Sequence, residues 1–128
     1  MSLRVNIQER KRGHYVVALE GRLDANTSPL CEDRLTPFLT PATDVMMFDM
    51  TDLTYISSAG LRVIFKVRKA IERHSGKMIL TNLRPQVQKV FEIINALPKE
   101  NIFSSIQEVD DYLDMMQKKV LREQKGEV

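Results

Sequence analysis

The sequence is poor in the features that mark metal-binding, secreted and membrane proteins. It contains one cysteine, Cys31, so an internal disulfide cannot form, and no group of cysteine and histidine residues has the spacing of a zinc site. No run of eighteen apolar residues occurs, and residues 1–12 alternate polar with apolar side chains instead of forming a signal segment. We therefore expect a cytoplasmic protein with no metal site and no membrane insertion.

A large charge excess and the common catalytic motifs are also missing. Nineteen Lys and Arg residues against seventeen Asp and Glu residues leave a formal net charge of +2, too small to indicate a nucleic-acid partner. The chain has no Gly-x-Ser-x-Gly elbow, no Gly-x-x-x-x-Gly-Lys phosphate loop and no Gly-x-Gly-x-x-Gly fingerprint. We expect no catalytic residues, no cofactor and no enzymatic activity.

What the sequence does have is the length and composition of one globular domain. Its 128 residues are 43% hydrophobic and 28% charged, which suits a single hydrophobic core. We expect one domain over residues 1–121, with Cys31 as a core residue. Residues 122–128 are charged and lack apolar spacing, so they are predicted to form a frayed tail.

The apolar pattern predicts an element order of β-β-α-β-α-β-α-α. Period-two alternation and short apolar runs predict strands at residues 3–7, 15–19, 45–50 and 77–81, the first two forming a hairpin at Gly13. Helix-start signals and helical spacing predict helices beginning at Ser28-Pro29, Leu61, Pro85 and Ser105. Strands joined by crossover helices imply an α/β sandwich, a mixed sheet of four to five strands with helices mainly on one face.

Several finer expectations follow from local signals. Residues 21–27 are predicted to be loop, residues 45–50 to be covered on both faces, and Pro37 to end the first helix early. Ser28 is predicted to cap that helix, Gly76 to end the second at the C′ position, and Ser105 with Glu108 to form a capping box. The side chains expected to face the core include Leu30, Leu35, Phe38, Leu39, Leu61, Val63, Ile64, Phe65, Val67, Ala70, Ile71, Ile106, Val109, Leu113, Met116 and Val120.

Two adjacent serines precede the second helix. A hydroxyl at a helix N-terminus meets unpaired backbone N–H groups and the positive end of the helix dipole, so a phosphate on Ser58 would be stabilised there. The simpler interpretation is that Ser57 or Ser58 only caps the helix. Both interpretations stay open, because one serine can cap while its neighbour accepts a phosphate.

The second helix also carries a basic stripe. At about 100° per residue, four cations fall on one narrow side of the helix, namely Arg62, Lys66, Lys69 and Arg73. Such a run is often only the solvated face of a helix. Four like charges at this spacing repel one another, however, which also fits a surface that docks onto an acidic partner.

Three stretches of the chain resemble the STAS domain family. Residues 52–64 read Asp-Leu-Thr-Tyr-Ile-Ser-Ser-Ala-Gly-Leu-Arg-Val-Ile, like the family's strand, loop and Ser-containing turn before a helix. Residues 19–24, Leu-Glu-Gly-Arg-Leu-Asp, and residues 82–87, Asn-Leu-Arg-Pro-Gln-Val, resemble a strand-ending loop and the last crossover. The resemblance spans residues 5–113, with the three stretches in the family's order.

The resemblance implies an anti-sigma factor antagonist, a regulatory protein of transcription and signal transduction. In that family a serine, here Ser58, is phosphorylated by an anti-sigma factor serine kinase of the histidine-kinase-like ATPase superfamily and dephosphorylated by a PP2C-type phosphatase. The unphosphorylated form binds the kinase and the phosphorylated form releases it. The known antagonists carry Asp-Ser-Ser/Thr-Gly, whereas this sequence has Ser57 in the acidic place and Ala59 in the second hydroxyl place.

The resemblance and the basic stripe together define a set of candidate contacts around Ser58. Asp24 lies in the loop that the resemblance puts beside the phosphoacceptor, although a loop Asp most often forms a turn. Ser58→Asp is expected to leave the fold stable, with its hydroxyl at the surface. The residues expected to contact the partner or the phosphate are Asp24, Ser57, Gly60, Arg62, Lys66, Lys69 and Arg73.

Two other functions remain as alternatives. The chain would also suit a STAS subunit of a membrane transporter or larger signalling assembly, docking through the same surface without phosphorylation. A nucleotide-binding domain is suggested only by a helix N-terminus beside a basic stripe. The hairpin edge is a candidate surface for a homodimer.

Overall fold

The computed structural model describes residues 2–96 and 105–126. Its elements follow the predicted order, with one short 3-10 turn added after the first helix. They are β1 (Leu3–Lys11), β2 (His14–Leu23), α1 (Ser28–Leu35), η1 (Thr36–Phe38), β3 (Val45–Ile56), α2 (Ser58–Arg73), β4 (Lys77–Thr81), α3 (Pro85–Ala96) and α4 (Ile106–Gln124).

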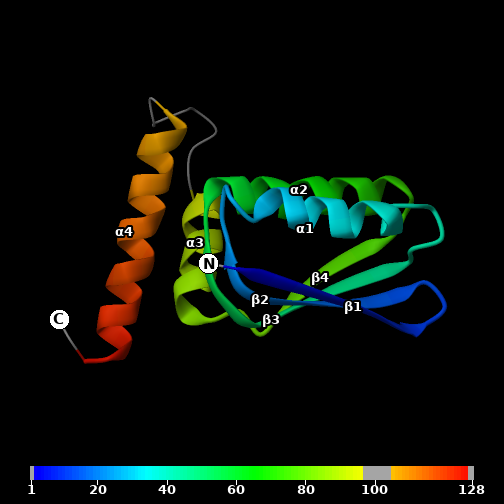
Figure 1. The fold of residues 1–128 in the computed structure, drawn as a ribbon, viewed down its shortest axis with the longest axis horizontal. Coiled ribbons are helices and arrows are strands. Elements are labelled where there is room, and N and C mark those ends of the chain that lie inside the picture. Colours follow the sequence, from blue (N-terminus) through cyan, green and yellow to red (C-terminus); the bar gives the residue numbers. More distant parts are fainter. Residues whose placement is uncertain (1, 97–104, 127–128) are drawn as a thin grey trace.

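The four strands form one mixed sheet in the order β1-β2-β3-β4 (Figure 1). β1 and β2 are antiparallel and form the predicted hairpin, whose turn uses Gly13 at a φ of 79°. β2 pairs parallel with β3, and β3 pairs parallel with β4, as expected for strands joined by helical crossovers. The predicted α/β fold class is confirmed.

Helices α1 and α2 lie side by side along one face of the sheet, and α3 and α4 stand at the end where β3 runs into α2 (Figure 1). The core fills the space between the sheet and α2. Its largest fully buried apolar side chains are Leu19, Leu23, Leu35, Met46, Phe48, Met50, Leu53, Ile56, Ile64, Ile71 and Leu113. The expected cover on both faces of residues 45–50 is wrong, because Val45, Met47 and Asp49 point to the other face and are only half-buried.

β3 is longer than predicted, running on to Ile56 instead of ending at Met50. Its register against β2 shifts at two irregular positions. Such a bulge switches which alternate side chains face the core, so Leu53 is buried where strict alternation would turn it outward. Because the alternation of buried and exposed side chains is interrupted at residues 51–52, the sequence of residues 51–56 did not show the pattern of a strand. β2 also continues to Leu23, three residues into the predicted loop at 21–27.

The end of α2 differs in detail from the prediction at Gly76. The residue in the left-handed region is Ser75, with a φ of 65°, so Ser75 takes the C′ position. Ser75 N–H donates to the Glu72 carbonyl and Gly76 N–H to the Ile71 carbonyl, each at 3.0 Å, which is the Schellman arrangement. Gly76 is needed for space, because a Cβ there would lie 2.7 Å from Ile71 Cγ2.

The first helix confirms the prediction at Pro37 and corrects the one at Ser28. α1 ends at Leu35 and Pro37 lies in the 3-10 turn η1. Ser28 is the first helical residue and Thr27 takes the N-cap position, one residue earlier than expected. The helix is short and buries only one narrow stripe, so Leu30 lies off that stripe and is 47% exposed.

Two further side chains predicted to be buried are exposed. Phe65 lies on the flank of α2, where its ring packs edge-on against Phe91 of α3, and it remains 37% exposed. Ile106 is the first residue of α4, one turn before the buried part of that helix, and is 61% exposed. Both errors arise at the margins of a helix face, where periodicity alone does not say how far the neighbouring elements reach.

The last helix packs against α3 and the start of α2. Ser105 caps it as predicted, its Oγ accepting from Glu108 N–H at 3.1 Å. α4 then continues to Gln124, so the segment expected to fray from Arg122 is helical for three more residues. Residues 127 and 128 of the predicted tail lie outside the described residues.

Candidate functional site

The start of α2 is built by the end of β3. Ser57 leaves the strand in an extended conformation, with φ −104° and ψ 179°, and its Oγ accepts a hydrogen bond from Gly60 N–H at 3.4 Å. Ser57 N–H donates to the Leu23 carbonyl at 3.0 Å, which ties the end of β2 to this turn. Ser57 is therefore the buried N-cap of α2, and the capping interpretation holds for this serine.

Gly60 is buried and serves close packing in this structure. A Cβ at this position would lie 2.8 Å from Leu23 Cγ, 2.8 Å from the Leu23 carbonyl oxygen and 2.9 Å from Ile56 Cγ1. The first turn of α2 can therefore approach the ends of β2 and β3 only because residue 60 lacks a side chain. Gly60 has no side chain and is buried, so the predicted contact with a partner or phosphate could use only its backbone atoms.

Ser58 is the first residue of α2, and its two polar groups differ in their surroundings. Its N–H donates to Asp110 Oδ1 of α4 at 2.9 Å. Its Oγ is buried and has no hydrogen-bond partner within the described residues, the only such side-chain atom in this part of the chain. The expected surface position of the Ser58 hydroxyl is thus wrong, because α4 packs over the helix start.

A second contact from α4 lies beside Ser58. Gln117 is fully buried and pairs with the backbone of Ile56, accepting from its N–H at 3.1 Å and donating to its carbonyl at 2.8 Å. Sequence reasoning missed both Asp110 and Gln117. Gln117 falls on the apolar spacing of α4 at one turn after Leu113, which was the only available signal that it is buried.

Tyr55 lies in the same region, beside α4. Burial, and next the nearby Asp114 carboxylate, raise the pKa of the Tyr55 hydroxyl to about 12, so the phenol stays protonated. The Arg22 guanidinium stacks over its ring, 3.9 Å from the centroid. The contact between Arg22 and the Tyr55 ring thus joins the end of β2 to the end of β3.

Asp24 follows β2 and has the bonds of a turn residue. Its Oδ1 accepts from the N–H groups of Asn26, at 3.0 Å, and Thr27, at 3.1 Å, while Oδ2 lies 3.6 Å from Arg22 Nε. These bonds order the loop that joins β2 to α1. They match the interpretation of Asp24 as a turn residue. A contact of Asp24 with a partner would be formed in addition to these bonds within the loop.

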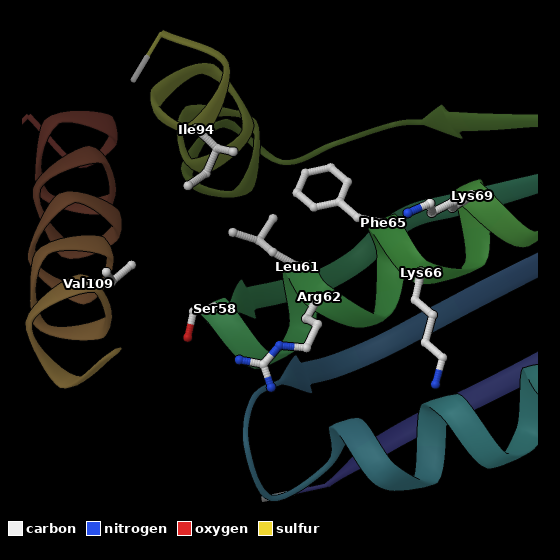
Figure 2. Close-up of a pocket in the computed structure, with 8 residues that line it drawn as sticks. All are labelled: Ser58, Leu61, Arg62, Phe65, Lys66, Lys69, Ile94 and Val109. Carbon is white, nitrogen blue, oxygen red and sulfur yellow. The ribbon is translucent and has the colours of Figure 1, made fainter. Parts of the chain in front are cut away.

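The basic stripe of α2 is divided by its neighbours. Lys66 turns toward α1 and pairs with Glu32, whereas the Arg62 guanidinium reaches back along α2 toward Ser58 (Figure 2). Lys69 lies one turn further on, and Arg73 is exposed at the far end of the helix. Within the described residues, Arg62, Lys69 and Arg73 have no ion pair, so they are the cations available to a partner.

A hollow of about 570 Å³ opens beside this stripe. Its apolar wall comes from three helices, and Val109 of α4 faces Ser58 across it (Figure 2). Basic side chains of α2 stand along its other side. The lining residues are Ser58, Leu61, Arg62, Phe65, Lys66, Lys69, Ile94 and Val109.

Two other features bear on the class of site. Among residues 2–96 and 105–126, no group of three His, Cys, Asp or Glu side chains is placed to hold a metal ion, and no helix is long and apolar enough to cross a membrane. Cys31 is fully buried, and burial raises the pKa of its thiol to about 12. Cys31 is therefore a core residue, as predicted.

Known proteins share both the sequence pattern and the fold. The family model of the STAS domain matches residues 5–109. The anti-sigma-B factor antagonist of Listeria monocytogenes is 27% identical over 93 residues, which cover 73% of this chain and 82% of that protein.

Solved structures agree on the fold. The anti-sigma factor antagonist SpoIIAA in its unphosphorylated form superposes with a TM-score of 0.66 at 22% identity, covering 72% of this chain and 81% of that one. Bacillus SpoIIAA in its phosphorylated form gives 0.61 at 21% identity, covering 71% and 83%. The murine anion transporter Slc26a9 gives 0.58 at 15% identity, covering 86% of this chain and 18% of that one. Because the matched family model spans most of the chain and the fold is shared, the protein belongs to the STAS domain family.

Proposed function

We propose that this protein is an anti-sigma factor antagonist that binds an anti-sigma factor kinase while Ser58 is unphosphorylated and releases it when Ser58 carries a phosphate. The observation that carries the proposal is the position of Ser58, at the N-terminus of α2 and on the rim of an apolar hollow flanked by cations. The related anti-sigma factor antagonists supply the class of partner, an anti-sigma factor.

Docking would use the hollow and its cationic side. Phe65, 37% exposed, and the half-buried Ile94 and Val109 supply apolar contact area of the kind that anchors protein interfaces. Arg62 and Lys69 supply positive charge that is not neutralised within the described residues. This combination fits a partner surface with an apolar centre and an acidic rim.

Phosphorylation would largely cancel the positive charge of this surface. The kinase would transfer the γ-phosphoryl group of ATP to Ser58 Oγ, and the phosphoserine would carry about −1.5 to −2 charges. The dipole of α2 and the Arg62 guanidinium, one turn away, would stabilise that charge. An acidic partner surface would then lose the attraction that favours docking, and a PP2C-type phosphatase would restore binding by hydrolysis. The protein itself acts by binding.

Binding of two Ser58 variants to the kinase tests this proposal. Titration calorimetry with the anti-sigma factor kinase and ATP should show that Ser58→Ala binds lastingly, whereas Ser58→Asp binds about a hundredfold more weakly. Ser75→Asp, at the opposite end of α2, is the matched control, because Asp tolerates the left-handed backbone there. Equal affinities for Ser58→Asp and Ser75→Asp would contradict the switch.

The buried Ser58 Oγ favours a second candidate, a STAS subunit that docks onto a transporter or signalling assembly without phosphorylation. In that case kinase and ATP would add no phosphate, and both Ser58 variants would bind alike.

β1 is an edge strand of the sheet, so the hairpin edge stays the proposed surface for a homodimer.

A further inference from the structure

We propose that α4 is a gate over Ser58. In the closed state Asp110 of α4 occupies the N-terminus of α2, so Ser58 is phosphorylated only when α4 lifts, and the phosphate then prevents Asp110 from returning. The inference rests on the proposed role of Ser58 as phosphoacceptor and adds how access to that residue is regulated.

The first step concerns access to the hydroxyl. A kinase must bring Ser58 Oγ into line with the γ-phosphate of ATP, which requires an exposed oxygen. Here the oxygen is buried, Val109 of α4 lies across the hollow from Ser58 (Figure 2), and Asp110 of α4 is bonded to Ser58 N–H. In the closed arrangement the acceptor is therefore hidden from a kinase, and removing α4 from the helix start is the smallest movement that uncovers it.

The second step concerns what keeps α4 closed. Its attachment to the start of α2 includes a charged bond, from Ser58 N–H to the Asp110 carboxylate at 2.9 Å. Two turns further along, Gln117 is bonded to Ile56 in the interior. The Asp110 end can therefore detach while the Gln117 end stays bound, so opening does not require α4 to dissociate as a whole.

The third step is competition between two anions for one position. The Asp110 carboxylate already binds the N–H at the positive end of the α2 dipole. A phosphate on Ser58 Oγ would accept a hydrogen bond from the same Ser58 N–H and would repel the Asp110 carboxylate. Because the two anions exclude each other, the coupling is reciprocal at equilibrium: the closed position of α4 disfavours a phosphate on Ser58, and the phosphate disfavours the closed position.

The movement would also alter the docking hollow. Val109 of α4 forms part of the wall that faces Leu61 and Phe65 of α2. Lifting the first turns of α4 removes that wall, so phosphorylation would change the shape of the surface as well as its charge. The surface of the closed, unphosphorylated form would therefore differ in shape from the surface that carries the phosphate.

Reactivity of a thiol at position 58 measures the closed state without any kinase. In Ser58→Cys, the rate of reaction with 5,5′-dithiobis(2-nitrobenzoate) reports exposure of the side chain, and the wild type is the blank because Cys31 is buried. We expect slow reaction in Ser58→Cys and a rate about tenfold higher when Asp110→Ala is added. Asp111→Ala, on the exposed neighbouring residue bonded to Gln107, is the matched control and should leave the rate unchanged.

Hydrogen exchange measures the opposite direction of the coupling. In Ser58→Asp, amides in the first turns of α4 should exchange about tenfold faster than in wild type, and adding Asp110→Asn should restore their protection. A fast thiol reaction in Ser58→Cys alone, no effect of Asp110→Ala, or unchanged exchange in Ser58→Asp would each overturn the gate. Neither the thiol assay nor the exchange assay contains a kinase. Either can therefore support the gate even if the binding experiments with the kinase contradict the switch, and the switch can hold even if the gate is contradicted.

Discussion

At the scale of single residues, two adjacent serines have different roles because the backbone turns between them. Ser57 is still extended and directs its Oγ to the N–H of Gly60, whereas Ser58 is already helical and directs its Oγ into a buried position without a partner within the described residues. A buried unpaired hydroxyl contributes little to stability, and it is the group that a modification could change without dismantling the helix cap.

Alanine substitutions should separate these two roles. Ser57→Ala removes the cap of α2 and should lower the free energy of unfolding by about 1 kcal/mol. Ser58→Ala removes an unpaired hydroxyl and should change it by less than about 0.5 kcal/mol. Urea denaturation at equilibrium measures both, and a larger loss in Ser58→Ala would show that the Ser58 hydroxyl has a structural bond.

Phosphopeptide mapping tests the same distinction chemically. After incubation with the anti-sigma factor kinase and ATP, mass spectrometry should place the phosphate on Ser58, because the Ser57 hydroxyl is engaged in the cap of α2, whereas the Ser58 hydroxyl has no partner within the described residues. In Ser58→Ala no phosphate should appear. Phosphate on Ser57 in the wild type would reverse the assignment.

At the scale of elements, α4 contributes more to the site than its position at the end of the domain suggests. It supplies Asp110 and Gln117 to the start of α2 and the end of β3, and Val109 to the hollow. Gln117 replaces, with one side chain, the backbone partners that Ile56 would have inside a wider sheet. Such a bond is costly to lose, because both Ile56 groups would remain buried.

Gln117→Ala should therefore lower the free energy of unfolding by about 3 kcal/mol, since two buried backbone groups lose their partner. Lys118→Ala is the matched control on the same turn. It removes an exposed ion pair with Asp114 and should cost less than about 1 kcal/mol. Equal losses in the two variants, measured by urea denaturation, would mean that the Gln117 bonds contribute no stability.

At the scale of the whole molecule, charge is nearly balanced in total but unevenly placed. The net charge of +2 hides a cationic side of α2, where Arg62 and Lys69 stand beside the apolar hollow. Attraction between such a patch and an acidic partner acts mainly on the rate of association and weakens as salt shortens the range of the field.

Two charge reversals with the same net effect should differ in association rate. Lys69→Glu, at the hollow, should slow association with the anti-sigma factor kinase about tenfold at low salt and flatten its salt dependence. Lys119→Glu, exposed on α4, changes the net charge equally and should have little effect. Stopped-flow rates at two salt concentrations distinguish them; equal rates would show that the stripe is an ordinary solvated face.

The family resemblance singled out Ser58 as the candidate switch residue, and the sequence by itself determined the element order, the hairpin, the strand at residues 77–81 and the start of α3. These features depend on local periodicity, capping and turn residues, which are encoded within a few positions of the chain. The family resemblance then related them to one known fold.

Only the tertiary structure decided the surroundings of Ser58. The bulges that carry β3 to Ile56 depend on pairing with β2, and the exposure of Phe65 depends on how far α3 reaches. The hydrogen bond from Ser58 to Asp110 joins residues 52 positions apart, and no local pattern specifies such a contact. It forms because α4 packs against α3 and the start of α2, so burial of the switch hydroxyl is a property of the assembled domain.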